Sequence, residues 1–126
     1  MSKIAYSAVV LDEKSRSKLL NFLSSEIPEN WETIAHHMTI NLGEIKPDFE
    51  KYLGMRVELS VIDLGISDKA IAVKVEGFPT VNKIPHITIA VNRKEGGKPY
   101  MSNKITDWKP IKFNSKLTGK VMEVKF

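Results

Sequence analysis

The chain of 126 residues is 42% hydrophobic and 27% charged, which is typical of one folded globular domain and argues against a disordered segment. It contains no cysteine, so disulfides, thiolate catalysis and cysteine-based zinc sites are excluded, and no apolar stretch approaches the roughly 18 residues that a membrane span needs. Lys and Arg number 19 against 15 Asp and Glu, and the resulting net charge of +4 is a mild basic bias that suits an anionic ligand without requiring one.

The first third of the chain predicts a strand, a helix and a second strand. Residues 3–11, KIAYSAVVL, are rich in strand formers and are bounded by charge. Asp12 is placed to cap a helix in which apolar side chains recur at helical spacing until Pro28 stops it. Residues 28–35 then predict a loop, and the strand pattern returns at residues 36–42.

The rest of the chain predicts mainly strands. One or two helical turns are expected in residues 46–54, and residues 92–104 predict a loop rich in Gly, Lys and polar side chains. Further strands are predicted at residues 55–66, 70–77, 86–91 and 120–126, the first two as a hairpin. The pattern indicates the α+β class, with mostly antiparallel strands and one main helix, in a single domain over residues 1–126. Because the N-terminal apolar run is too short for a signal peptide, we expect a soluble cytoplasmic protein.

One four-residue pattern occurs twice, as HMTI at residues 37–40 and as HITI at residues 86–89. Two of the three histidines of the chain stand in this frame. Side chains alternate between the two faces of a strand, so each His and Thr share one face while the two apolar residues face the core. The sequence therefore predicts a polar face that carries His37, Thr39, His86 and Thr88.

This set of side chains suits the cleavage of a phosphodiester. An imidazole titrates near neutral pH, so one histidine can act as the base that activates water while the other donates a proton to the departing ribose oxygen. The threonine hydroxyls would donate hydrogen bonds to the nonbridging phosphate oxygens. The scheme needs no metal, and the sequence does not indicate which histidine is the base.

A structural role is the alternative for each histidine, because a single His-x-Thr tetrad on a strand is more often structural than catalytic; the pair in one frame favours catalysis. His36 precedes His37 and, on a strand, would point to the opposite face, so we expect it to be structural or exposed. The same alternation disfavours a zinc site built from His36, His37 and His86, although three imidazoles and a water form a known catalytic set. We therefore expect no metal and no other cofactor.

The two tetrads resemble the signature of the two-histidine (2H) phosphoesterase superfamily. This resemblance implies a bilobal α+β fold, in which pseudosymmetric sheets enclose a central cleft and each lobe contributes one motif. It also implies that His37 and His86 form the acid–base pair and that Thr39 and Thr88 hold the phosphate. A second stretch, GGKPYMSN at residues 96–103, is similar to a segment of the cyclic phosphodiesterase module of fungal-type tRNA ligases. That likeness implies that Lys98, Ser102 and Asn103 border the cleft.

Two aromatic residues are further candidates for substrate contact. The ring of Tyr6, on the first predicted strand, could stack on a base, and a role in the core is the equal alternative. Trp31, in the loop before the first motif, could also stack or merely cover the core. Trp108 is expected to pack. Lys98 could contact phosphate, with a solvated lysine as the alternative.

Two kinds of function follow from these features. The first is a metal-independent phosphodiesterase acting on an RNA end that bears a 2′,3′-cyclic phosphate, or on a cyclic nucleotide or oligonucleotide. The second is a catalytically silent module of the same fold that binds RNA or a nucleotide. A duplicated His and Thr favours the enzyme, because a pure binder needs neither an acid nor a base. We expect it to act as a monomer without membrane contact.

Overall fold

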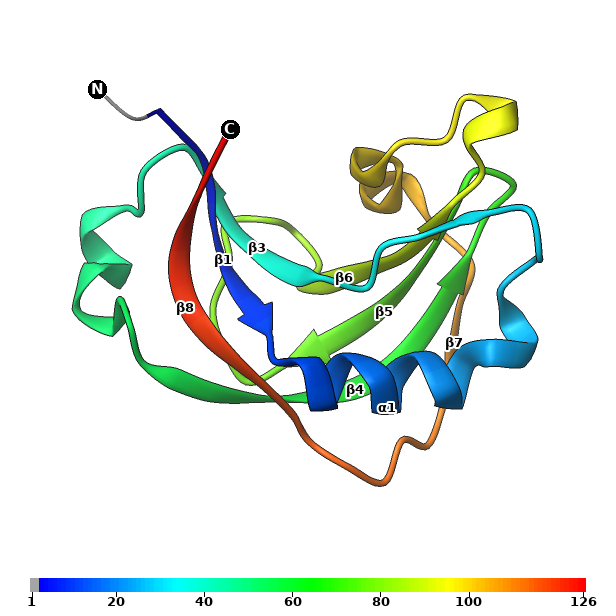
Figure 1. Cartoon of the computed structure of the whole chain (residues 1–126), viewed down its shortest axis with the longest axis horizontal. Helices are drawn as coiled ribbons and strands as arrows, with labels where there is room; N and C mark the ends of the chain where they lie inside the picture. Colours follow the sequence, from blue (N-terminus) through cyan, green and yellow to red (C-terminus); the bar gives the residue numbers. More distant parts are fainter. Residues whose placement is uncertain (1–2) are drawn as a thin grey trace.

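The computed structural model describes residues 3–126, which form an antiparallel sheet and one long helix (Figure 1). The helix α1 spans Glu13–Leu23. The strands are β1 Ile4–Leu11, β2 Glu32–Thr33, β3 His37–Leu42, β4 Arg56–Ile66, β5 Ala70–Glu76, β6 His86–Val91, β7 Trp108–Pro110 and β8 Leu117–Lys125. Four short 3-10 helices are η1 Ser24–Glu26, η2 Pro47–Tyr52, η3 Arg93–Glu95 and η4 Pro99–Lys104.

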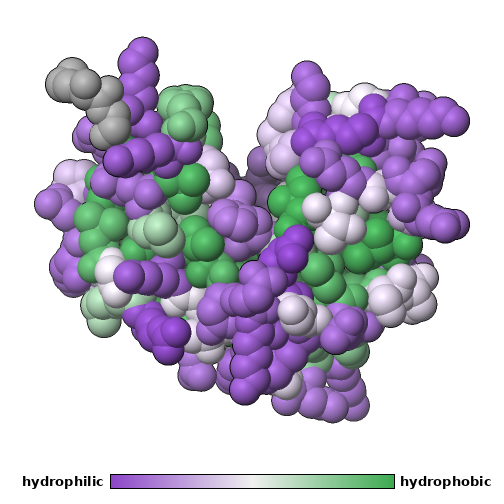
Figure 2. Space-filling view, in the orientation of Figure 1, coloured by the Kyte–Doolittle hydropathy of each residue, from purple (hydrophilic) through white to green (hydrophobic). Residues whose placement is uncertain are grey.

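The strands form one continuous sheet in the order β2-β6-β3-β1-β8-β4-β5, and β7 pairs with β4. Every pairing among the described residues is antiparallel. Strand β5 also pairs with β6, from Ala70 opposite Val91 to Lys74 opposite His86, so the sheet closes on itself. The predicted α+β class, with mostly antiparallel strands and one main helix, is confirmed. The two motif strands share this one sheet, and Figure 2 shows a hollow between two lobes of the surface.

Helix α1 begins at the predicted cap. The Asp12 carboxylate accepts a hydrogen bond from the backbone N–H of Ser15 at 2.8 Å, and this bond is the main reason that the pKa of Asp12 lies below its ordinary value. Leu19 and Leu23 are buried in the core, where α1 contacts β8. The α-helix ends at Leu23 and continues as the 3-10 turn η1 as far as Glu26, so the predicted helix is confirmed with a tighter last turn.

The structure differs from the sequence prediction mainly in the last third of the chain. The predicted loop 92–104 contains η3 and η4, and the left-handed Gly96 ends the first of them. Strand β7 was not predicted because three residues carry no periodic signal. The expected packing role of Trp108 is confirmed, since its ring packs against a small apolar cluster and over Gly65, where a Cβ atom would clash with it. No helix within residues 3–126 combines the length and apolar character needed to cross a membrane.

Candidate active site

Strand β3 separates its polar and apolar side chains as the first motif predicts. Met38 and Ile40 are fully buried in the core. His37 and Thr39 alternate with them on the other face and are half-buried. The apolar pair thus anchors the strand, and the His and Thr side chains are directed away from the core from a rigid element.

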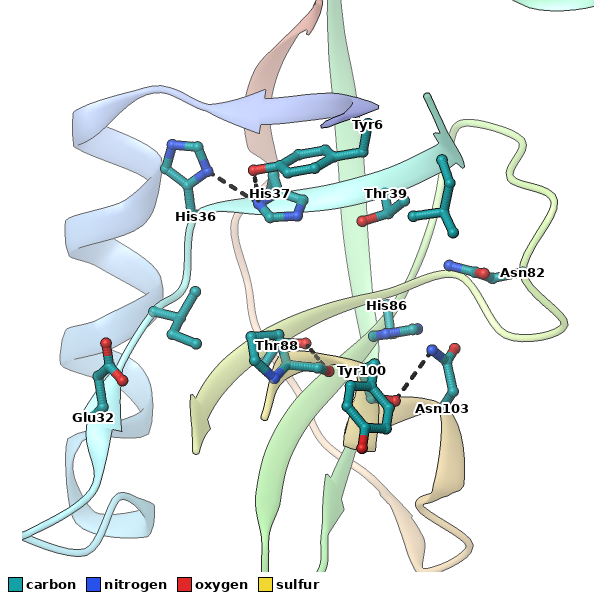
Figure 3. Close-up of a pocket in the computed structure, with 13 residues that line it drawn as sticks. Tyr6, Glu32, His36, His37, Thr39, Asn82, His86, Thr88, Tyr100 and Asn103 are labelled. Atoms are coloured by element: carbon teal, nitrogen blue, oxygen red, sulfur yellow. Dashed lines mark hydrogen bonds between the residues drawn. The ribbon is translucent and has the colours of Figure 1, made fainter. Parts of the chain in front are cut away.

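Strand β6 repeats this arrangement. Ile87 and Ile89 are fully buried, Thr88 is half-buried and His86 is 8% exposed. The two motif strands meet antiparallel at one pair of residues, Met38 opposite Ile87. In this register His37 lies beside Thr88 and Thr39 lies beside His86, as Figure 3 shows. The four polar side chains therefore occupy the corners of one surface, with the histidines on a diagonal.

These four side chains line a pocket of about 680 Å³. Its walls come from β1, β2, β3, β6, η4 and the loops beside them, so segments distant in the sequence converge on it (Figure 3). The lining residues are Tyr6, Glu32, Ile34, His36, His37, Thr39, Leu42, Asn82, His86, Thr88, Pro99, Tyr100 and Asn103. The pocket is open to solvent and large enough for a nucleotide-sized ligand.

The orientation of His86 is fixed by the backbone. Its Nδ1 lies 2.8 Å from the carbonyl oxygen of Ile84, and because a carbonyl only accepts, Nδ1 carries the proton and donates it. In the neutral ring Nε2 is then left with a lone pair. Burial lowers the pKa of His86, and the hydrogen bond to Ile84 opposes this shift. The ring is therefore prepared to accept a proton at Nε2.

His37 is held by side chains instead. The ring of Tyr6 stacks on it at a centroid distance of 4.5 Å, and the Tyr6 hydroxyl lies 3.5 Å from His37 Nδ1. The same Nδ1 lies 3.0 Å from Nδ1 of His36. Burial, followed by the positive charges that His36 and His86 can carry, lowers the pKa of His37 from 6.5 to about 4.

The position of His36 corrects the sequence prediction. His36 was expected to point away from His37, but both imidazoles line the pocket and contact each other. Strand β3 begins only at His37, and the preceding Ala35 has a φ of 44°, so strand alternation does not extend back to His36. The backbone carbonyl of His36 accepts a hydrogen bond from the N–H of Leu11 at 3.0 Å, which anchors this turn to the end of β1.

The threonines differ in their partners. The hydroxyl of Thr88 lies 2.8 Å from that of Ser102, which is buried beneath it in η4, and 3.3 Å from the carbonyl of Pro99. Thr39 is held through its backbone, whose carbonyl accepts a hydrogen bond from the Thr80 hydroxyl at 2.7 Å. Among the described residues, the Thr39 hydroxyl has no hydrogen-bond partner.

The remaining predicted contacts divide into two groups. Tyr6 and Asn103 line the pocket, and Ser102 lies behind Thr88. Lys98 and Trp31 are not among the lining residues: Lys98 is exposed just before η4, and Trp31 is half-buried against the main core.

Sequence reasoning missed several lining residues besides His36. Tyr100 lies between the Lys and Ser of the KPYMSN stretch, is 54% exposed and presents its ring at the pocket, so its place in that segment was an available signal. Asn82 belongs to the loop before β6 and has no periodic or motif signal. Glu32 lines the outer wall and pairs with Arg93.

The described residues 3–126 contain no group of three or more His, Cys, Asp or Glu side chains arranged to hold a metal ion. The three histidines thus do not form the zinc site that was considered from the sequence.

Comparison with known protein families identifies the family of the chain. The family model of the fungal tRNA ligase phosphodiesterase domain matches residues 16–126, which include both His-x-Thr tetrads and the segment 96–103. No curated protein matches the chain in sequence. The family match extends over most of the chain, from within α1 through β8. The chain therefore belongs to this family of two-histidine cyclic phosphodiesterase domains.

Proposed function

We propose that the protein hydrolyses a 2′,3′-cyclic phosphate at the end of an RNA, with the two histidines as base and acid and without a metal. One observation carries the proposal: His37 and His86 lie on a diagonal of one pocket surface, with Thr39 and Thr88 at the other corners. A phosphate bound over the centre of this surface would meet one imidazole on each side. Displacement at phosphorus proceeds in line, so the attacking and departing oxygens need groups on opposite sides.

His86 is the general base in this proposal. Its Nδ1 proton is committed to the Ile84 carbonyl, which leaves the Nε2 lone pair free to take a proton from the attacking water. Burial lowers the pKa of His86, and this shift favours the neutral ring. A neutral imidazole is the form that a base requires.

His37 is the general acid and donates a proton from Nε2 to the departing ribose oxygen. Its Nδ1 faces the Tyr6 hydroxyl and His36, both of which can donate to it, so this ring is suited to carry its own proton on Nε2. General acid–base catalysis of this kind contributes roughly 10²- to 10⁴-fold for each group. The hydroxyls of Thr39 and Thr88 would donate to the nonbridging oxygens as their charge redistributes.

The walls of the pocket favour a nucleotide as the ligand. Tyr100 presents an aromatic ring at the mouth, and a ring of this kind stacks on any nucleobase. The amide side chains of Asn82 and Asn103 can pair with the edge of a base. The net charge of +4 and the family, which implies an RNA substrate, both favour an RNA end over a free cyclic nucleotide.

A substrate panel in EDTA tests the proposal. The panel contains an RNA with a 2′,3′-cyclic phosphate end, nucleoside 2′,3′-cyclic phosphates and cyclic dinucleotides, and products are separated by chromatography. We expect the RNA end to be opened fastest, and we expect His37→Ala and His86→Ala each to reduce turnover by roughly 10²- to 10⁴-fold. The exposed Lys18→Ala on α1 is the matched control.

The outcomes separate the alternatives. Preferred cleavage of cyclic dinucleotides would replace the RNA end as the substrate. Binding without turnover of any substrate would indicate the catalytically silent module. Turnover that EDTA abolishes would contradict a metal-independent reaction.

A further inference from the structure

The proposed acid has a chemical difficulty that the fold around it resolves. Burial, followed by the charges that His36 and His86 can carry, places the pKa of His37 at about 4, so at neutral pH its ring is not an imidazolium. A neutral imidazole gives up its Nε2 proton readily only if Nδ1 receives another proton at the same time. The donor to Nδ1 therefore matters for the acid step.

Two groups face His37 Nδ1. The Tyr6 hydroxyl is 3.5 Å away, and burial raises the pKa of Tyr6, so the phenol keeps its proton at neutral pH. Nδ1 of His36 is closer, at 3.0 Å. When His36 is protonated both of its ring nitrogens are donors, and the hydrogen bond between the two rings then runs in one direction only, from His36 to His37.

His36 also reaches the solvent. Its side chain is exposed, whereas His37 is half-buried beneath the Tyr6 ring. An exposed imidazole can exchange protons with water directly. His36 therefore lies between the half-buried His37 and the bulk water, and Figure 3 shows the positions of the two rings.

We propose that His36 is a positioning residue that supplies, through His37, the proton received by the departing oxygen; this inference rests on the proposed function. The water oxygen bonds to phosphorus while His86 Nε2 takes a water proton. The bond from phosphorus to the ribose oxygen breaks, and that oxygen takes the Nε2 proton of His37. At the same time Nδ1 of His37 takes the Nδ1 proton of His36. His86 ends protonated, His36 ends neutral and His37 ends with its proton on Nδ1 instead of Nε2; proton exchange with solvent restores all three.

The charged groups in the segments around His36 have partners other than His36. On α1, Arg16 donates to the carbonyl of Ile34 at 3.3 and 3.2 Å and lies 3.9 Å from Glu13, so its charge is partly balanced. On β2, Glu32 pairs with Arg93. The other titratable groups that line the pocket are Tyr6, His37, His86 and Tyr100. No carboxylate among the described residues forms an ion pair with His36.

The experiment compares His36→Asn with His36→Ala on an RNA ending in a 2′,3′-cyclic phosphate. The Asn side chain places an N–H close to where Nδ1 of His36 lies and can donate a hydrogen bond to His37, but it cannot pass on a proton. We expect both variants to lose roughly 10- to 100-fold in kcat with little change in KM. In both, the pH–rate profile should differ from that of the wild type, because the group that supplies the proton has been removed.

Each other result overturns the relay. If His36→Asn keeps the wild-type kcat while His36→Ala loses it, His36 only orients His37 through the hydrogen bond. If both variants keep the wild-type rate and pH profile, His36 takes no part. Failure of the proposed function itself would look different: the wild type would not open the cyclic phosphate, or His86→Ala would remain active. Lys18→Ala controls for the effect of changing an exposed residue.

Discussion

On β6 the imidazole of His86 is held by a backbone carbonyl, whereas on β3 the imidazole of His37 is held by the side chains of Tyr6 and His36. The threonines differ as well, since the Thr88 hydroxyl is bonded within the fold and the Thr39 hydroxyl, among the described residues, is not. Two copies of one sequence pattern thus stand in unlike surroundings.

The difference bears on chemistry. A hydrogen bond to a carbonyl has one direction, so the tautomer of His86 is fixed for as long as the strand keeps its shape. The hydrogen bond between the two imidazoles has no such fixed direction, so in the proposed reaction His37 can receive a proton from His36 at Nδ1 while it donates one from Nε2. A ring with one fixed tautomer suits the base of the proposed reaction, and a ring that can be reprotonated suits the acid.

The largest expected effect separates the two histidines by the leaving group. In a cyclic phosphorothiolate, sulfur replaces the departing ribose oxygen, and a thiolate leaves without a proton. We expect His37→Ala to regain most of the wild-type rate on this substrate, while His86→Ala stays roughly 10²- to 10⁴-fold slower on both substrates. Steady-state kinetics with sulfur at the 2′ or the 3′ position would also show which oxygen departs. Equal rescue of both variants would contradict the assignment of roles.

A second prediction concerns stability and pH. The pKa of His37 is about 4 in the folded chain against an ordinary 6.5, so between these pH values the unfolded chain binds more protons. The contribution of His37 to the free energy of unfolding should therefore be complete above about pH 6.5. It should decrease by on the order of 3 kcal/mol as the pH falls toward 4. The lowered pKa of His86 adds a loss in the same direction.

Urea denaturation at a series of pH values measures the slope of the free energy of unfolding against pH. His37→Gln should remove the larger part of it, and His86→Gln a part of it. The Asp12 carboxylate, whose pKa is lowered from 3.8, loses its contribution only at more acidic pH and so does not obscure the comparison. A slope unchanged in His37→Gln would show that His37 is not buried as the structure has it.

The threonines provide a third test of the asymmetry. Thr88→Val removes the partner of the buried Ser102 hydroxyl, and an unsatisfied buried hydroxyl costs about 1–3 kcal/mol. Thr39→Val leaves no such group and should be near neutral in unfolding free energy. Both variants should lose turnover if both hydroxyls contact phosphate. The double variant Thr88→Val/Ser102→Ala should recover stability but not activity. Equal destabilisation by Thr88→Val and Thr39→Val would contradict the difference between the two hydroxyls.

Much of the fold follows from local patterns in the sequence. The Asp12 cap, the buried Leu19 and Leu23 of α1, and the alternation along β3 and β6 all depend on short-range spacing and are found in the structure. The closure of the sheet through β5 and β6 could not be predicted, because pairing between strands depends on packing across the whole chain. Strand β7 is too short for its three residues to show a period.

The candidate site divides in the same way. The shared face of each His and Thr was predictable because strand alternation determines it. The contact between His36 and His37 was not, since it depends on the left-handed φ of Ala35, a residue type that rarely adopts this conformation. Asn82 reaches the pocket from an irregular loop, where spacing carries no information.

The smallest expected effect concerns Tyr6 and sharpens the account of His37. The Tyr6 hydroxyl is 3.5 Å from His37 Nδ1, which is long for a hydrogen bond, so Tyr6→Phe should change turnover by less than about 10-fold and leave the His37 pKa low. The ring matters more than the hydroxyl, because it stacks on the imidazole and burial is the largest cause of the lowered pKa. Tyr6→Leu should therefore raise the pKa of His37 from about 4 toward 6.5, which an NMR titration of the imidazole protons would detect. If Tyr6→Phe raised the pKa of His37 as much as Tyr6→Leu, the hydroxyl of Tyr6 rather than its ring would keep His37 neutral. A proton route through Tyr6 would then compete with the route through His36.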